Sequence, residues 1–245
     1  MLIRLIQSDM SIQEKILLAL IMIFALTLSF SIHEFMHAFV ADRLGDPTPR
    51  NMGRLTLNPV AHMDPVGTVL LLIAGFGWGK PVMYNPNRLN KFRSPRLMNI
   101  MVHLAGVTGN FILALLSAVV ATVIVCLSHG RIAQGSMAAV AVSTVVQALS
   151  YTETFSLMLL AFNLLPVPPL DGFHVLEELL PYRIRSKEGY RKFEMFSPYA
   201  IWILFILSRF GNIDIIGMLI MYIQLPFMYV INAICNLISM GFGLG

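Results

Sequence analysis

Residues 31–43 read SIHEFMHAFVADR and contain an H-E-x-x-H pattern formed by His33, Glu34 and His37. On a helix, two histidines four residues apart lie on one face and can bind a single zinc ion. The glutamate beside the first histidine can then act as a general base toward a water molecule on the metal. The pattern lies at the end of an apolar run, where ionisable groups are costly and usually mark function.

The composition is that of an integral membrane protein. Of the 245 residues, 57% are hydrophobic and 12% are charged, and the mean hydropathy is +0.74, whereas a soluble domain carries about 25% charged residues. The formal net charge of +4 comes from basic residues in a few loops, which points to membrane topology and not to a nucleic-acid partner. Cys126 and Cys235 lie in different apolar runs and are expected to be packing residues.

The apolar runs predict an all-α polytopic membrane protein with about four to six transmembrane helices. The predicted helices are residues 12–44, 94–127 and 136–165, followed by an apolar region at 198–244. Ser11 and Glu14 form a capping-box pattern at the start of the first helix. Breaks at Arg209 and Pro226 make the last region either one span with a half-span or two spans. Residues 1–245 are interpreted as a single integral-membrane domain.

Residues 46–95, between the first two helices, are rich in Pro, Gly and Asn and are predicted to form a re-entrant or β region. Residues 54–57 and 81–84 have the pattern of short extended pieces. The apolar run at 66–74 is too short to span a bilayer. It is interpreted as re-entrant or protein-covered, because irregular backbone at membrane depth must be buried in protein or line a wet cavity.

The distribution of Lys and Arg predicts the orientation of the chain. Eight of them lie between residues 41 and 97 and five in a basic loop at 181–197, whereas the turn between the second and third helices has only Arg131. The positive-inside rule therefore places the ends of the first and third helices on the cytoplasmic side. The H-E-x-x-H pattern and the segment that follows the third helix then face the same compartment.

A proline-rich loop at residues 163–172 follows the third helix, reads NLLPVPPLDG and carries Asp171. A catalytic zinc site has three protein ligands and one open position for water. Two histidines and Asp171 supply that set and leave Glu34 free as the base, although Asp171 alone could also be a helix N-cap. Asn163 either caps backbone groups at the helix end or hydrogen-bonds an extended substrate or a developing oxyanion.

The remaining four histidines are isolated in the sequence; they are His62, His103, His129 and His174. Each is expected to be an ordinary interfacial or loop residue. His174 lies one turn beyond Asp171 and is the best candidate among them for an outer contact to the metal site.

The motifs at residues 33–37 and 163–172 together resemble the site-2 protease family of intramembrane zinc metalloproteases, peptidase family M50. Residues 53–59, 64–67 and 77–82 look like the compact bacterial branch of that family, and no PDZ-sized insertion follows the motifs. The resemblance covers residues 16–172. Within it, residues 105–110 resemble the family's Gly-Pro-x-x-Asn element but carry Val107 where proline is usual, which leaves the role of Asn110 open.

The resemblance implies one catalytic Zn²⁺ ion bound by His33, His37 and Asp171. It also implies that Glu34 activates water and that Asn163 contacts the substrate. The substrate would be a membrane-spanning protein, such as a membrane-tethered transcription regulator, that is cut in or near its transmembrane segment.

The resemblance further implies a small membrane-associated sheet within residues 46–86 that pairs with the unwound substrate. The enzyme would be a multi-pass protein of the bacterial cell membrane, with its active site toward the cytoplasm and the lipid bilayer around it.

Two other functions are compatible with such a metal site. A zinc-binding scaffold that holds a partner helix without cutting it would be expected to lack Glu34 or a metal ligand, and the sequence lacks neither. A metal or ion transporter would carry polar residues along several helix interiors, whereas the second helix and the last span have almost none. The sequence therefore favours a zinc metalloendopeptidase.

Overall fold

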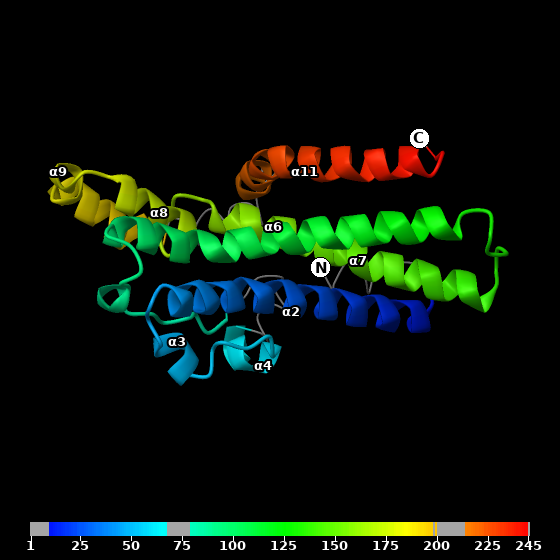
Figure 1. The fold of residues 1–245 in the computed structure, drawn as a ribbon, viewed down its shortest axis with the longest axis horizontal. Helices are drawn as coiled ribbons and strands as arrows, with labels where there is room; N and C mark the ends of the chain where they lie inside the picture. Colours follow the sequence, from blue (N-terminus) through cyan, green and yellow to red (C-terminus); the bar gives the residue numbers. More distant parts are fainter. Residues whose placement is uncertain (1–9, 68–78, 198, 200–213, 245) are drawn as a thin grey trace.

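Four long helices run along the longest axis of the molecule (Figure 1). The computed structural model describes residues 10–67, 79–197, 199 and 214–244. The long helices are α2 (Ile12–Arg43), α6 (Pro95–Ser128), α7 (Met137–Asn163) and α11 (Ile215–Gly241). Each is long and apolar enough to cross a membrane. The described part of the chain is therefore that of a membrane protein with four candidate spans.

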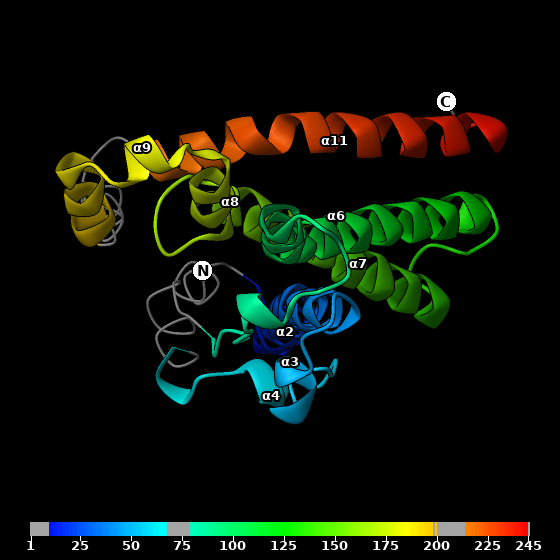
Figure 2. The same cartoon turned by 60° about the vertical axis from the view of Figure 1, so that its left-hand side comes forward.

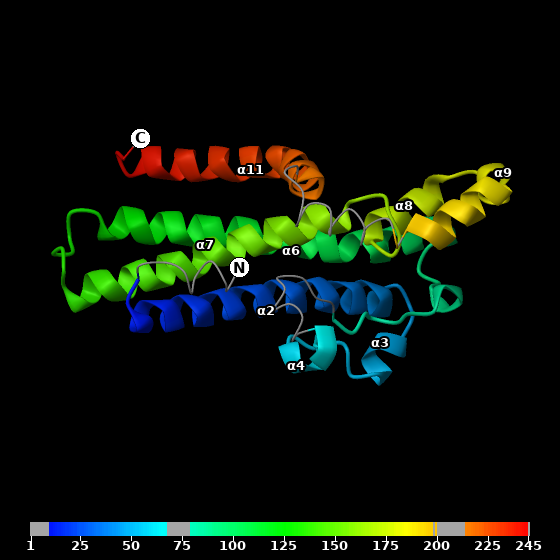
Figure 3. The same ribbon diagram turned by 180° about the vertical axis from the view of Figure 1, so that it is seen from behind.

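Short helices connect the long ones. Between α2 and α6 these are α3 (Thr48–Asn51), α4 (Pro59–His62) and the 3₁₀ turn η1 (Pro86–Arg88). After α7 come α8 (Asp171–Leu179), α9 (Tyr182–Arg185) and a helical segment at residues 188–197. In Figures 1 and 3 these connections lie away from the α6–α7 turn, on the same side of the molecule as the C-terminal part of α2.

The helices α2, α6 and α7 pack on one another, and α11 packs on α6 and α7 on the side away from α2 (Figure 2). The contact between α2 and α7 contains a cluster of Met22, Ala25 and Phe155 and a polar pair, in which the hydroxyls of Ser29 and Ser156 lie 2.9 Å apart and are fully buried. Leu160 and Ala161 of α7 pack on Val107 of α6. Close packing of this kind drives helix association in lipid, where no hydrophobic force acts between helices.

The ends of α2 follow from its sequence. The Ser11 hydroxyl accepts a hydrogen bond from Glu14 N, and the Glu14 carboxylate accepts one from Ser11 N, so the predicted capping box is confirmed. After the helix, Gly45 adopts a φ of 112°, and a Cβ at this position would lie 2.3 Å from Asn90 Oδ1. The bounds of α2, α6 and α7 lie within two residues of the predicted helices 12–44, 94–127 and 136–165.

The predicted β region is not supported in the part of residues 46–95 that the structure describes. Residues 46–67 and 79–94 form α3, α4, η1, a helical stretch at 65–67 and irregular backbone, with an isolated antiparallel bridge between Met63 and Gly79. Asn58 caps α4 by accepting a hydrogen bond from Val60 N, and Pro59 occupies the first helical position. Both features favour a helical turn over an extended strand.

Two further predictions for apolar segments have different outcomes. The predicted re-entrant run at 66–74 lies mostly outside the described residues, as do residues 200–213 with the predicted break at Arg209. The predicted break at Pro226 is wrong, since this proline lies inside the continuous helix α11. Neighbouring groups in a membrane helix can satisfy the backbone carbonyl that a proline leaves without its hydrogen bond.

Asp46 anchors the segment that follows α2. Its fully buried carboxylate accepts hydrogen bonds from Thr48 N at 3.1 Å, from the Thr48 hydroxyl at 2.6 Å and from Asn85 N at 2.5 Å. The side chain thereby joins the turn before α3 to the segment that carries Tyr84 and leads to η1.

Replacing Asp46 by alanine is expected to release residues 79–91 from the rest of the protein. The change leaves three donors without their acceptor, and a hydrogen bond to a charged group contributes about 1.5–3 kcal/mol. We expect faster tryptic cleavage at Arg88 and Lys91 and a lower unfolding midpoint in detergent. Asp214→Ala, which removes the exposed cap of α11, is the matched control and should not change cleavage there. Unchanged cleavage of the Asp46 variant would contradict the anchoring role.

Candidate metal centre

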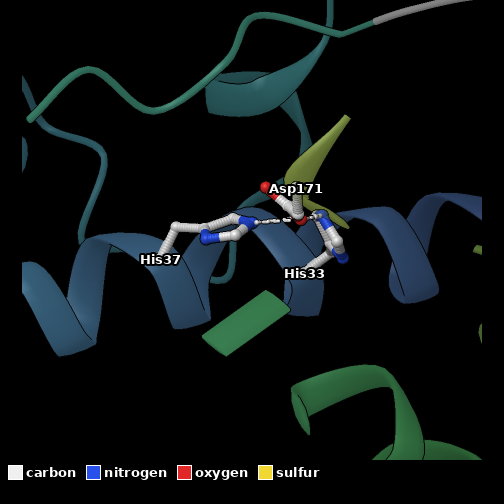
Figure 4. Close-up of side chains that lie close together, drawn as sticks. All are labelled: His33, His37 and Asp171. Atoms are coloured by element: carbon white, nitrogen blue, oxygen red, sulfur yellow. Dashed lines mark hydrogen bonds and ion pairs between the residues drawn. The ribbon is translucent and has the colours of Figure 1, made fainter. Parts of the chain in front are cut away.

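His33 and His37 project from one face of α2, a single turn apart (Figure 4). The two residues are only 4% and 8% exposed. Their ring centroids lie 4.7 Å apart and their Nε2 atoms 3.1 Å apart. The four-residue spacing of the sequence pattern therefore brings two imidazole nitrogens to one buried point.

Asp171 reaches the same point from the first turn of α8 (Figure 4). Its Oδ2 lies 3.2 Å from His33 Nε2 and 3.3 Å from His37 Nε2. The N-cap of α8 is Leu170 and no side chain caps this helix, so the alternative interpretation of Asp171 as an N-cap is wrong.

The loop between α7 and α8 brings Asp171 back to the bundle. The prolines that follow Leu165 end α7, because proline cannot continue a helix. Beside Asp171, Gly172 lies against the end of α7, and a Cβ at this glycine would be 2.3 Å from the carbonyl oxygen of Leu164. The glycine thus permits the close approach that places the carboxylate next to the two histidines.

The three side chains fit a catalytic zinc ion. His37 Nδ1 lies 2.7 Å from the carbonyl oxygen of Val102, which can only accept, so the ring proton is on Nδ1 and Nε2 presents a lone pair. The two Nε2 atoms and Asp171 Oδ2 form a triangle with edges of 3.1, 3.2 and 3.3 Å. Tetrahedral zinc with bonds of about 2.0 Å holds its ligand atoms about 3.3 Å apart. Three electron-rich atoms at this spacing repel one another unless they share a cation.

Helix α6 orients both histidines. Asn110 is fully buried, and its side-chain nitrogen lies 3.2 Å from His33 Nδ1, while its Oδ1 has no partner in the described part of the chain. With the Asn110 amide rotated by 180°, its Oδ1 accepts a hydrogen bond from a protonated Nδ1 of His33. This arrangement gives Oδ1 a partner and leaves Nε2 of His33 for the metal. Together with the carbonyl of Val102, this contact fixes the orientation of both rings.

Asn110→Ala is expected to weaken zinc binding about 10- to 100-fold, because His33 loses the group that fixes its ring and its tautomer. Asn110→Asp keeps an acceptor at the same position and should retain most of the affinity. Competition with a chromogenic zinc chelator measures both values. Thr108→Ala, which changes an exposed hydroxyl on the same helix, is the control. Equal affinity of Asn110→Ala and the unaltered protein would show that the contact does not support the metal site.

The structure also brings His103 of α6 to the site, a residue that the sequence interpretation missed. His103 Nδ1 lies 3.9 Å from Asp171 Oδ1, and its Nε2 lies 2.9 Å from the Tyr84 hydroxyl. Burial, together with nearby carboxylates, chiefly that of Glu178, raises the pKa of Tyr84. The tyrosine therefore stays protonated and can donate to His103 Nε2. In that tautomer the proton on His103 Nδ1 faces the oxygen of Asp171 that is turned away from the histidine pair.

A signal for His103 exists in the sequence. It precedes Asn110 by seven residues, which places both side chains on one face of a helix. His174, which was the preferred outer residue, stacks on the ring of His103 at 4.7 Å between centroids. It therefore lies one layer further from the metal centre than predicted. His62 is buried elsewhere, with Nε2 2.8 Å from the carbonyl oxygen of Thr56.

Glu34 is 8% exposed and follows His33 on α2. Its Oε2 accepts a hydrogen bond from Val82 N at 3.1 Å. Val82 lies in the irregular segment that Asp46 anchors through Asn85. The carboxylate is therefore held next to the metal ligands by its own helix and by a backbone donor from the connection between α2 and α6.

Asn163 is the last residue of α7, and its side-chain nitrogen donates to the carbonyl oxygen of Leu159 at 2.9 Å. Among the described residues, no hydrogen bond joins it to the metal ligands. The structure therefore brings together His33, His37 and Asp171 with Glu34 at their side, and a contact of Asn163 with substrate stays a prediction.

Comparison with known proteins agrees with this chemistry. Residues 127–208 match the model of the family described as Peptidase family M50. The chain is 42% identical over 167 residues to a Bacillus subtilis protein named "Putative zinc metalloprotease YwhC", a match that covers 68% of this chain and 72% of that protein. No solved structure matches the chain.

Mycobacterial proteins named "Putative zinc metalloprotease Rip2" are also similar. The protein of Mycolicibacterium smegmatis is 32% identical over 61% of this chain and 53% of its own length. That of Mycobacterium tuberculosis is 29% identical over 73% of this chain and 63% of its own length. The chain therefore belongs to peptidase family M50, the site-2 protease family of zinc metalloproteases, and its cluster of His33, His37 and Asp171 can hold the zinc ion.

Proposed function

We propose that this protein is an intramembrane endopeptidase that hydrolyses a peptide bond in or near the transmembrane segment of another membrane protein. The observation that carries the proposal is the position of the site. His33, His37 and Glu34 are each less than 9% exposed and lie on α2, one of four apolar helices long enough to span a membrane. A peptide that reaches these residues must therefore approach from within or beside the bilayer.

The residues of the site support hydrolysis by a water molecule. Zinc, when bound by His33, His37 and Asp171, supplies a Lewis acid that makes water nucleophilic near neutral pH. Glu34 then accepts the proton of the attacking water and returns it to the leaving amine. The hydrogen bond from Val82 N holds the carboxylate of Glu34 in place. Asn163, at the end of α7, is assigned to the binding of the substrate backbone.

The substrate helix must unwind before it is cut. In an α-helix each carbonyl accepts a hydrogen bond from the residue four positions later, so it is not available to an attacking water. Gly, Pro and Asn near the cut site lower the cost of unwinding. We therefore expect the substrates to be membrane-tethered proteins, transcription regulators among them. They should carry such residues in the part of their span that lies level with the metal centre.

We also propose that the active site faces the cytoplasm of a bacterial cell. The supporting observation is the excess of Lys and Arg in the segments that flank the site, which the positive-inside rule assigns to that side. A cysteine introduced at Lys187, which lies in the basic segment 181–197, should react in intact cells only with a membrane-permeant maleimide. Labelling by an impermeant reagent would reverse the proposed orientation.

The function is tested with the purified full chain in proteoliposomes. The substrates are tagged single-span proteins that differ only in whether the span carries a Gly-Pro or Asn-Pro pair or leucines. We expect cleavage within the modified span, its loss on treatment with a zinc chelator, and its return when zinc is restored. Stoichiometric zinc binding without cleavage of any span, together with retention of a span as a stable complex, would favour the non-enzymatic scaffold.

A further inference from the structure

Glu153 is an ionisable residue in the interior of a membrane-spanning helix, and the proposed hydrolysis does not use it. It precedes Asn163, the end of α7, by ten positions, which corresponds to about 15 Å along the helix. Within the described residues it makes no hydrogen bond or ion pair. Carboxylates within a membrane usually pair with another group or line a polar cavity, and they mark functional sites.

The side chain lines a cavity of about 310 Å³ between α6, α7 and α11, here named the Glu153 cavity. All three helices contribute polar groups to its wall. These are Thr122 from α6, Ser150 and Glu153 from α7, and Asn232 and Ser239 from α11. None of the metal ligands lines it, so the cavity is a site separate from the metal centre.

We infer that the Glu153 cavity receives the side chain of a lysine or arginine on a membrane-spanning helix of a different protein. An ammonium group has three donors and no acceptor. The carboxylate of Glu153 supplies a charged acceptor, and the amide oxygen of Asn232 and the hydroxyl of Ser150 supply neutral ones. The volume admits one long side chain but not a helix, which is about 10 Å across.

A second copy of this chain does not supply the cation from its described spans. The Lys and Arg residues of these four helices are Lys15, Arg43 and Arg96, and each lies within four residues of a helix end. At Asn232 the depth of the cavity argues against the amine of a lipid headgroup, whereas the wall extends to Cys126 and Ser239, each two residues from a helix end, so added phosphatidylethanolamine is needed to distinguish the two sources. Asn232 precedes Gly241, the end of α11, by nine positions or about 14 Å. This is close to the centre of a hydrocarbon layer about 30 Å thick.

Helix α11 leaves room for such a partner. Ile231 is its only buried residue within the described chain, and α11 packs on α6 and α7 along one side (Figure 1). A helix that lies beside α11, at the edge where α11 faces α6 and α7, can turn one long side chain into the Glu153 cavity. Polar contacts of this kind add to helix association in lipid, because the alternative for both groups is hydrocarbon.

The test is the binding of a synthetic helix to the full-length protein in nanodiscs of phosphatidylcholine. The probe is an apolar helix of about 20 residues with one lysine near its centre, and a matched probe carries leucine at that position. Energy transfer between labelled probe and protein gives the apparent Kd. We expect the lysine probe to bind at least about tenfold more tightly than the leucine probe, and Glu153→Gln to remove most of this difference.

Thr154→Ala is the matched control, because Thr154 is exposed, follows Glu153 on α7 and does not line the cavity. It should keep the full preference for lysine, and Asn232→Leu should reduce it. Zinc content verifies that each variant is folded, and no step of the test depends on hydrolysis. Equal binding of both probes to the unaltered protein overturns the proposal, as does a lysine preference that survives Glu153→Gln. A preference abolished by added phosphatidylethanolamine overturns it in favour of a lipid amine.

Discussion

Glu34→Gln is expected to lower the rate of peptide hydrolysis by about 10²- to 10⁴-fold while the protein keeps its zinc. Glutamine has the shape of glutamate, and its side-chain oxygen can still accept the hydrogen bond from Val82 N. It has no basic oxygen that takes a proton from water, so only the proton transfer is lost. Initial cleavage rates in proteoliposomes, together with the zinc content of the same preparations, measure the two effects separately.

The control for this variant is Glu188→Gln. Glu188 is an exposed glutamate that pairs with Lys192 at 2.8 Å, away from the site, and its replacement should change neither rate nor zinc content. If Glu34→Gln cuts at more than half the native rate, another group must be the base. If it loses zinc as well as activity, Glu34 supports the metal centre instead of transferring a proton.

The parts of the structure that the sequence predicted well depend on local order along one helix. A spacing of four residues is enough to place His33 and His37 on one face, whatever packs against α2. The length and apolar character of the spans, and the cap at Ser11, are likewise properties of short segments. The sequence also predicted that the segment carrying Asp171 lies at the same end of the bundle as the two histidines, because the distribution of Lys and Arg places both segments on one side of the membrane.

The predictions that failed needed knowledge of what packs beside a segment. Residues 54–57 have an extended pattern, but a strand needs a partner, and the adjacent Asn58 and Pro59 start a helical turn. The spacing of His103 and Asn110 puts them on one helix face, but only the contacts of α6 with α8 and α2 show that this face meets the metal ligands. The sequence around Glu153 does not indicate a cavity, because the cavity is formed by three separate helices.

Helix α6 can approach the metal ligands closely because residue 106 is a glycine. A Cβ at this position would lie 2.4 Å from His37 Nε2 and 2.6 Å from His33 Cε1. Real Cβ atoms do not approach other heavy atoms so closely, so a larger residue must displace the two rings or push α6 away. Both outcomes separate the histidines from their outer partners, since Val102 and Asn110 lie on the same helix.

Gly106→Ala is therefore expected to weaken zinc binding by more than about 100-fold, beyond the usual effect of losing one outer contact, and to abolish hydrolysis. A loss of zinc affinity would be informative, because helix propensity alone predicts the opposite effect on the protein. Alanine is favoured over glycine in a helix by about 1 kcal/mol and should on that ground stabilise α6. Chelator competition measures the affinity, and circular dichroism of the apoprotein shows that the helices are retained.

Gly109→Ala on the same helix is the matched control. A Cβ there would lie 2.5 Å from Met36 Cγ, on a flexible side chain that is not a metal ligand. Overpacking of this kind costs about 1–3 kcal/mol of stability, so the variant should unfold at a lower temperature yet bind zinc with nearly native affinity. A Gly106→Ala protein that binds zinc as tightly as Gly109→Ala would mean that α6 does not press on the histidine pair, and the orientation of both rings by this helix would then have to be abandoned.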